Sequence, residues 1–105
     1  MKEISVQELK QMMDRKDDFQ LIDVREMNEY EYCRIEGSRH IPIGEVLSRV
    51  DELNHHMDVI FHCKTGGRSG AMVNALMARG YKNVVNLKGG IMAWSEEIDP
   101  TVPTY

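Results

Sequence analysis

One segment of the sequence gathers residues that can do chemistry together, Cys63-Lys64-Thr65-Gly66-Gly67-Arg68-Ser69. A short apolar run precedes it and a helical pattern follows it, so it is expected to be a loop between a strand and a helix. Glycines there allow positive φ, so successive backbone N–H groups can turn toward one point, where the positive end of the helix also points. A cysteine in such a nest is expected to have a lowered pKa and to act as a nucleophile.

Two cations, Lys64 and Arg68, belong to the same segment, and no acidic residue lies between Asp58 and Glu96. A locally basic stretch in an acidic chain suits a site that handles anions. A buried segment that is simply poor in acids explains the charge pattern equally well. The other cysteine, Cys33, lies in a polar stretch without glycines and is expected to be structural, with a resolving-thiol role as the alternative.

Composition bounds the remaining possibilities. The chain has 105 residues, a net charge of −4 and 42% hydrophobic residues, which fits one globular domain over residues 1–105. The acidic total argues against nucleic-acid binding, and no apolar run is long enough for a membrane span. Neither cysteine spacing nor histidine spacing matches a metal site, and free cysteines without a signal sequence suggest the cytoplasm.

Strand and helix patterns alternate along the chain. Strands are expected over 19–24, 58–62 and 83–87, with a short extended piece within 37–42. Helices are expected from the Ser5–Glu8 capping box, over 25–32, over 45–53, over 69–79 with Gly80 as a cap, and over 91–98. This alternation predicts an α/β fold with a mainly parallel sheet and helices on both faces. The Cys63 loop would lie at the carboxyl end of a strand, where ligands bind in such sheets.

Four segments in this order resemble the single-domain rhodanese family of sulfurtransferases. They are 21–26 (Leu-Ile-Asp-Val-Arg-Glu), 30–42, the C-x-x-G-x-R-S loop 63–69, and 87–94, ending at a tryptophan. The resemblance covers nearly the whole chain and implies a rhodanese-like fold with a five-stranded, mainly parallel sheet. Where many of these proteins read Gly-His-Ile, this chain has Cys33-Arg34-Ile35, so no role is carried over from that glycine and histidine.

The resemblance also implies a mechanism. Cys63 would take the outer sulfur of thiosulfate or of a persulfide donor, and a nucleophilic acceptor would then take that sulfur from the Cys63 persulfide. Backbone N–H groups of residues 64–69, including those of Gly66 and Gly67, would hold the persulfide anion. Lys64 and Arg68 would bind an anionic donor, and Thr65 and Ser69 would offer hydroxyls. No metal or organic cofactor is needed.

A closer similarity is to the rhodanese domains at the C-terminus of E1-like adenylating enzymes of molybdopterin and thiamine biosynthesis. It rests on 29–33, the turn 39–42 and the tail 99–105. It implies a small ubiquitin-like sulfur-carrier protein as a partner, and it implies that this chain is one domain of a longer protein, with a stand-alone homologue as the alternative.

Asp23 and Arg25 lie at the end of the first expected strand. They are expected to form either an ion-pair network behind the loop or a salt bridge that only stabilises the fold. His62 precedes Cys63 in a strand and so points to the opposite face, which makes it a structural residue rather than a base for the thiol. Trp94 is expected in the core.

Other functions fit parts of the pattern. A cysteine phosphatase or arsenate reductase also uses a Cys…Arg loop, but the six residues from Cys63 to Arg68 are one fewer than that cradle needs. A recognition domain without activity, or a persulfide carrier that barely uses free thiosulfate, would share the fold. The presence of Cys63 favours catalysis over pure recognition.

Overall fold

The computed structural model describes all residues from 1 to 105. The strands are β1 (Glu3–Ile4), β2 (Phe19–Asp23), β3 (Arg39–His40), β4 (Asp58–His62) and β5 (Val84–Leu87). The α-helices are α1 (Val6–Asp14), α2 (Met27–Tyr32), α3 (Gly67–Ala78) and α4 (Gly90–Glu97). Two 3₁₀ helices, η1 (Ile43–Glu45) and η2 (Leu47–Glu52), lie between β3 and β4.

The five strands form one sheet in the order β1-β5-β4-β2-β3, and every neighbouring pair is parallel. The central strand β4 therefore delivers its carboxyl end, and the loop that follows it, to the middle of one sheet edge. This arrangement confirms the α/β fold with a five-stranded parallel sheet that the sequence predicts.

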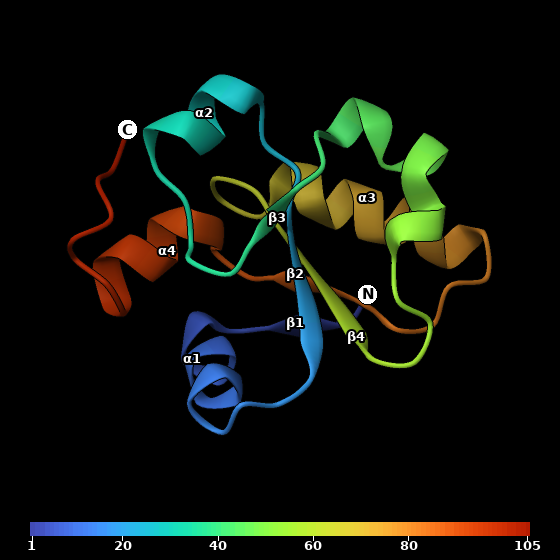
Figure 1. Cartoon of the computed structure of the whole chain (residues 1–105), viewed down its shortest axis with the longest axis horizontal. Coiled ribbons are helices and arrows are strands. Elements are labelled where there is room, and N and C mark those ends of the chain that lie inside the picture. The colour runs from blue at the N-terminus through green and yellow to red at the C-terminus, as the bar shows by residue number, and fades with distance from the viewer.

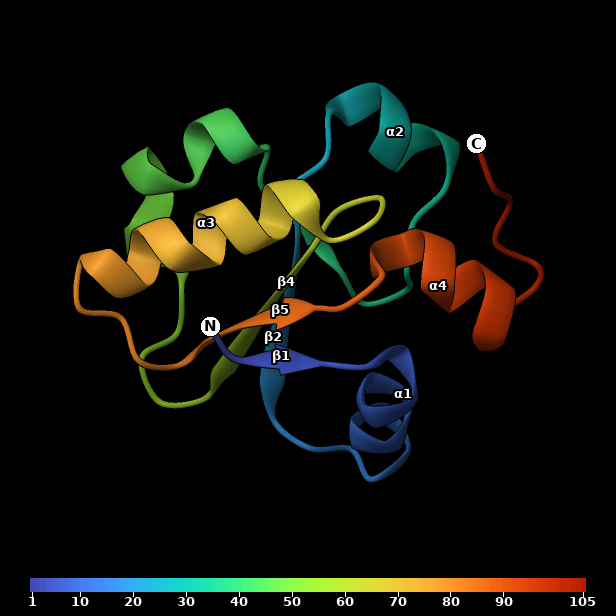
Figure 2. The ribbon, with the colours of Figure 1, turned by 180° about the vertical axis from the view of Figure 1, so that it is seen from behind.

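Helices cover both faces of the sheet (Figures 1 and 2). On one face α3 and the segment of η1 and η2 pack over a cluster that includes Ile22, Phe61 and Val73. On the other face α1 and α4 pack over a second cluster that includes Leu9, Ile60 and Trp94. Trp94 is buried, as expected. Three helices, α1, α3 and α4, thus bury an apolar side against the sheet, which is the main source of their stability, whereas α2 has no buried residue.

Local signals fix the ends of two helices. The hydroxyl of Ser5 accepts the Glu8 N–H at 3.1 Å, and the Glu8 carboxylate accepts the Ser5 N–H at 3.3 Å, so the capping box is present. At the end of α3, Gly80 has a φ of +95° and its N–H bonds to Met77, while the Tyr81 N–H bonds to Leu76. These two bonds form a Schellman motif and confirm the predicted glycine cap.

The helix expected over 45–53 is wrong. The chain makes two 3₁₀ helices with a kink at Arg49, whose φ of −123° is not helical. The Arg49 side chain bonds both Glu45 and Glu52, and Leu47 is exposed. The two-residue strand β1 was also not predicted, because two residues carry no periodicity.

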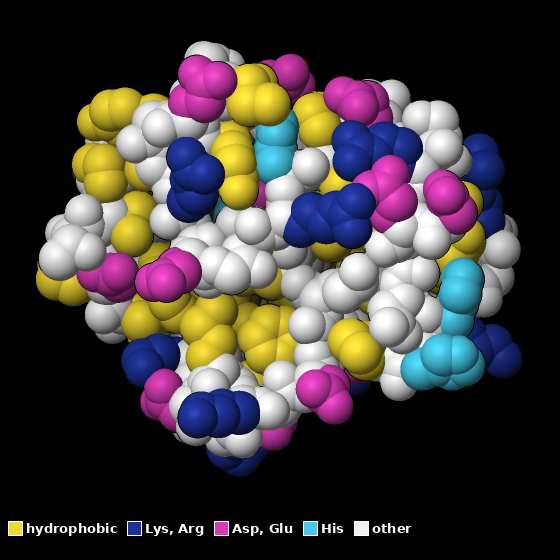
Figure 3. Space-filling model, in the orientation of Figure 1, with side chains coloured by type: hydrophobic (Ala, Val, Ile, Leu, Met, Phe, Trp, Pro, Cys, Tyr) yellow, Lys and Arg dark blue, Asp and Glu magenta, His cyan; other side chains and the backbone are white.

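Charges of both signs alternate over the face in Figure 3, and apolar side chains show at the bottom of a hollow between α1 and α4. Met13 and Trp94 are among the residues that line a hollow there. No helix combines the length and the apolar character that crossing a membrane requires.

Candidate active site

The loop from Cys63 to Gly66 leaves the carboxyl end of β4 and turns directly into α3. Gly66 has a φ of +105°, so the turn uses the left-handed conformation that favours glycine. Gly67 begins the helix and does not have a positive φ. Only one of the two glycines therefore makes the predicted turn, and α3 starts two residues earlier than the sequence suggested.

The thiol of Cys63 lies at the centre of this turn. The Gly66 N–H donates to Cys63 Sγ at 3.1 Å, and the N–H and the hydroxyl of Ser69 approach it at 3.5 and 3.4 Å. The first turn of α3 contributes Ser69, so the positive end of the helix faces the sulfur as well. The loop brings together the nest that the sequence predicts around Cys63.

Two opposing effects act on the ionisation of Cys63, whose side chain is only 1% exposed. Burial by itself would raise the pKa of the thiol, but hydrogen bonds from Ser69, Gly66 and Thr65 outweigh it, and the pKa is lowered. The direction agrees with the expectation for a cysteine in such a nest.

Asn86 supports the loop from β5 and was missed at the sequence level. Its Oδ1 accepts the Ser69 hydroxyl at 2.6 Å, and its Nδ2 donates to the Gly66 carbonyl at 3.2 Å and to Glu3 Oε2 at 2.9 Å. Ser69 has one hydroxyl proton, so Asn86 and Cys63 share a single donor. The signal in the sequence was an asparagine inside an apolar strand. Asn86 is 2% exposed in the structure, and a buried amide needs partners.

The N-terminus of α4 closes the loop from the other side. The N–H groups of Ile91 and Met92 donate to the carbonyls of Cys63 and Lys64, both at 3.0 Å. Gly90 has a φ of +59°, and a Cβ on it would lie 2.5 Å from both carbonyl oxygens. A glycine at position 90, the first residue of α4, is therefore required for this close approach.

The remaining loop side chains do not gather around the thiol. The Arg68 guanidinium pairs with Glu29 of α2, at 2.8 Å from Nη1 to Oε1 and 3.0 Å from Nη2 to Oε2. Lys64 Nζ lies 4.5 Å from the centre of the Tyr105 ring. Thr65 is exposed and its hydroxyl has no hydrogen-bond partner. Glu29 and Tyr105 were not among the expected site residues, since neither adjoins the loop in the sequence.

Asp23 and Arg25 form a buried ion pair, with 2.7 Å from Arg25 Nη2 to Asp23 Oδ2. Arg25 also donates to the Cys33 carbonyl at 2.6 Å and to the Tyr105 hydroxyl at 2.9 Å. The Tyr105 hydroxyl in turn donates to Glu29 at 2.6 Å. A continuous chain of contacts thus runs from the ion pair to Arg68 of the loop, which favours the network interpretation over an isolated salt bridge.

His62 and Cys33, which were expected to be structural residues, are both buried. His62 is fully buried, has no hydrogen-bond partner on either ring nitrogen, and lies 3.8 Å from Asp23. Cys33 is buried at the end of α2 in the core under α1 and α4. No three His, Cys, Asp or Glu side chains gather closely enough to hold a metal ion.

Residues 5–97 match the family model described as the rhodanese-like domain. The chain belongs to the rhodanese-like domain family. The rhodanese-like domain protein from Staphylococcus aureus has the same fold, with a TM-score of 0.85, 28% identity, and coverage of 100% of this chain and 99% of that one. The family identity and the fold therefore agree with the resemblance seen in the sequence.

Relatives of this rhodanese-like domain differ in length. A protein of Allochromatium vinosum named Sulfurtransferase is 33% identical, over 95% of this chain and 94% of that protein. Rhodanese-like/PpiC domain-containing protein 12, chloroplastic, of Arabidopsis thaliana is 40% identical, over 99% of this chain and 37% of that protein. The Probable adenylyltransferase/sulfurtransferase MoeZ of Mycobacterium tuberculosis is 32% identical, over 97% and 26%, which confirms the similarity to adenylating enzymes. The chain spans half or less of several such relatives.

Proposed function

We propose that this rhodanese-like domain is a sulfurtransferase that carries sulfur on Cys63. The observation behind the proposal is the ring of donors around the thiol, with the Gly66 N–H at 3.1 Å and both donors of Ser69 within 3.5 Å. Such donors stabilise an anionic sulfur, first as the thiolate and then as the outer sulfur of a persulfide. A six-residue loop suits a single sulfur atom better than a phosphoryl group.

The reaction is a double displacement. The Cys63 thiolate attacks the outer sulfur of thiosulfate, a new S–S bond forms, and sulfite leaves with the electron pair of the broken bond. With a persulfide donor R–S–SH the same attack releases the thiolate R–S⁻. An acceptor such as cyanide then attacks the outer sulfur of the Cys63 persulfide, forms thiocyanate and returns the Cys63 thiolate. Neither step needs a change in the oxidation state of a metal or an organic cofactor.

Relatives support sulfur transfer and suggest the wider setting. One relative is named Sulfurtransferase, and another combines adenylyltransferase and sulfurtransferase in its name. We propose that residues 1–105 form one domain. We also propose that the ion pair of Asp23 and Arg25 supports the Cys63 loop from behind. A small ubiquitin-like sulfur-carrier protein is the acceptor we propose to test first.

Intact-mass measurement tests the proposal directly. The protein is incubated with thiosulfate or with inorganic polysulfide, and a second sample is then chased with cyanide. We expect the mass of one sulfur atom on Cys63 and its loss after the chase. Cys63→Ser should not be labelled, while the matched variant Cys33→Ser should be labelled like the wild type. If neither donor loads sulfur on Cys63, the protein is not a sulfurtransferase of this kind.

One observation favours a second candidate function, a persulfide carrier with little activity on free thiosulfate. Glu29 occupies both terminal nitrogens of Arg68, the loop cation expected to bind an anionic donor. Labelling by polysulfide together with weak labelling by thiosulfate would support this candidate.

A further inference from the structure

Both cations of the Cys63 loop have partners from outside the loop. The carboxylate of Glu29 takes Arg68 in a bidentate ion pair, the arrangement in which guanidinium groups bind carboxylates most strongly. The ring of Tyr105 lies 4.5 Å from Lys64 Nζ, within the range of a cation–π contact. An inorganic anion that enters the loop would have to compete with both partners.

Tyr105 also fixes the position of Glu29. Arg25 can only donate hydrogen bonds, so its contact at 2.9 Å uses a lone pair of the Tyr105 oxygen. The Tyr105 hydroxyl proton is then directed to Glu29 Oε2, 2.6 Å away. The hydrogen bonds from Arg68 and Tyr105 lower the pKa of Glu29 to about 2, so this carboxylate is charged at neutral pH.

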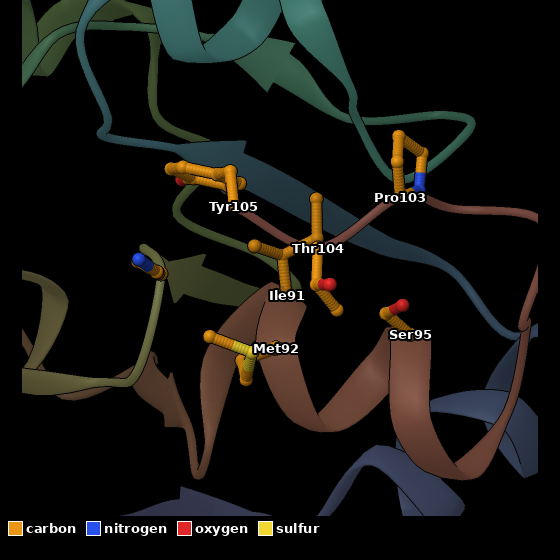
Figure 4. Close-up of a pocket in the computed structure, with 7 residues that line it drawn as sticks. Ile91, Met92, Ser95, Pro103, Thr104 and Tyr105 are labelled. Atoms are coloured by element: carbon orange, nitrogen blue, oxygen red, sulfur yellow. The ribbon is translucent and has the colours of Figure 1, made fainter.

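The segment that carries Tyr105 is packed in place. Figure 4 shows Pro103, Thr104 and Tyr105 passing over Ile91 and Met92 of α4. Ser95 of α4 donates a hydrogen bond to the Val102 carbonyl, and the end of the chain lies beside α2 in both ribbon views (Figures 1 and 2). These contacts hold Tyr105 against α2 and the Cys63 loop.

We propose that Glu29, positioned by Tyr105, is a specificity-determining residue that cancels the charge of Arg68 and favours persulfide donors over thiosulfate. The proposal rests on the proposed function and names the class of donor. Thiosulfate carries two negative charges, and its sulfonate oxygens need cationic partners. A persulfide R–S–SH presents the same transferable sulfur without a sulfonate group. Pairing of the loop cations should therefore weaken the binding of a persulfide donor much less than the binding of thiosulfate.

The charge at the thiol can be measured without turnover. Iodoacetate and iodoacetamide both alkylate Cys63, but only iodoacetate is charged, so the ratio of their rates reports the local potential and cancels changes in thiol reactivity. We expect Glu29→Gln to raise this ratio about 2- to 10-fold at low salt, the effect of one unit charge at short range in a solvent-like dielectric. The rise should shrink at high salt.

The donor preference follows from the same charge. Because thiosulfate is a dianion, the gain in its kcat/KM in Glu29→Gln should be about the square of the gain in the alkylation ratio, mainly through a lower KM. The rate with a neutral alkyl persulfide should change little. Glu31→Gln is the matched control, since it removes one exposed charge from the same helix without a contact to the loop, and it should leave the ratio close to the wild-type value.

Tyr105→Phe removes the hydroxyl and keeps the ring over Lys64, so it should move the ratio in the same direction by less. An unchanged ratio in Glu29→Gln, or an equal rise in Glu31→Gln, would overturn the proposal. Parallel changes with thiosulfate and persulfide would also overturn it. Failure of the wild type to load sulfur from any donor is a different result, which rejects the proposed function while the alkylation ratio still measures the charge.

Discussion

The thiol of Cys63 is buried and yet its pKa is lowered, so its reactivity depends on individual hydrogen bonds rather than on exposure or on a free cation. Arg68 is neutralised by Glu29, and the nearest donors are backbone N–H groups and one hydroxyl. The Ser69 hydroxyl is the only side-chain donor among these contacts to the thiol, which makes it the most direct place to change the thiolate.

Ser69→Ala should raise the pKa of Cys63, because a hydrogen bond that favours the ionised thiol is lost while the backbone donors stay. The rate of alkylation by iodoacetamide as a function of pH measures this value. Thr65→Val is the matched control, since it also removes a hydroxyl from the loop but one without a partner. Equal profiles for all three proteins would show that the Ser69 hydroxyl serves Asn86 alone.

Arg25→Met should lower the free energy of unfolding by about 3–5 kcal/mol, because Asp23 would remain buried without its ion-pair partner. Adding Asp23→Asn removes the unpaired charge, so the double variant should be more stable than the sum of the two single losses predicts. Urea unfolding of the four proteins gives the coupling. Strictly additive losses would mean that the two side chains act independently.

Helices and strands marked by a hydrophobic pattern or a capping motif could be predicted from the sequence. Breaks and boundaries that depend on individual tertiary contacts could not. β2 and β4 were recognised as apolar runs, and α1 from its capping box. The break at Arg49 depends on side-chain bonds to Glu45 and Glu52 that periodicity does not encode. The start of α3 at Gly67 likewise depends on how the loop turns at Gly66.

Gly90 allows the N-terminus of α4 to pack closely against the Cys63 loop. Gly90→Ala would place a Cβ 2.5 Å from the carbonyl oxygens of Cys63 and Lys64 and would put alanine at a φ of +59°. We expect a loss of at least about 2 kcal/mol in the free energy of unfolding. We also expect a changed alkylation rate of Cys63, because the loop must move away from α4.

Gly80→Ala provides the control at the far end of α3. Gly80 also has a positive φ, +95°, but a Cβ there meets open space. This variant should lose about 1 kcal/mol through backbone strain alone and keep the wild-type alkylation rate. A Gly90→Ala protein that behaves like Gly80→Ala in both measurements would show that the approach of α4 does not hold the loop.

At the scale of the whole molecule, the site is assembled from distant parts of the chain. The Cys63 loop was recognisable because its residues are contiguous. The pairing of Arg68 with Glu29 and the contact of Tyr105 with Glu29 join residues far apart in sequence, and only the packing of α2 and the C-terminal segment around the loop creates them. The basic stretch after Asp58 suggested a site that handles anions, but the packing pairs Arg68 with Glu29 and places Lys64 beside the Tyr105 ring.

The buried His62 couples the stability of the whole fold to pH. Burial lowers the pKa of His62, the negative charge of Asp23 opposes this shift, and Arg25 adds to it, so the folded protein holds the imidazole neutral. In the unfolded chain a histidine binds its proton near pH 6.5. As the pH falls below about 6.5 the unfolded state takes up this proton before the folded state does, so the stability falls by up to about 1.4 kcal/mol per pH unit.

Urea unfolding between pH 7.5 and 5.5 measures this slope for the wild type, for His62→Gln and for His56→Gln, which alters an exposed histidine. His62→Gln should be less stable at pH 7.5 if its amide lacks partners, but its stability should fall less steeply with decreasing pH. His56→Gln should keep the wild-type slope. The pKa of Glu29 is lowered from 4.5 to about 2, so its contribution to stability is lost as the pH falls from about 4.5 to about 2. This window lies below the range from pH 7.5 to 5.5, so Glu29 does not mask the effect of the histidine there. Identical slopes for the wild type and His62→Gln would mean that His62 becomes protonated in the folded protein as readily as in the unfolded chain.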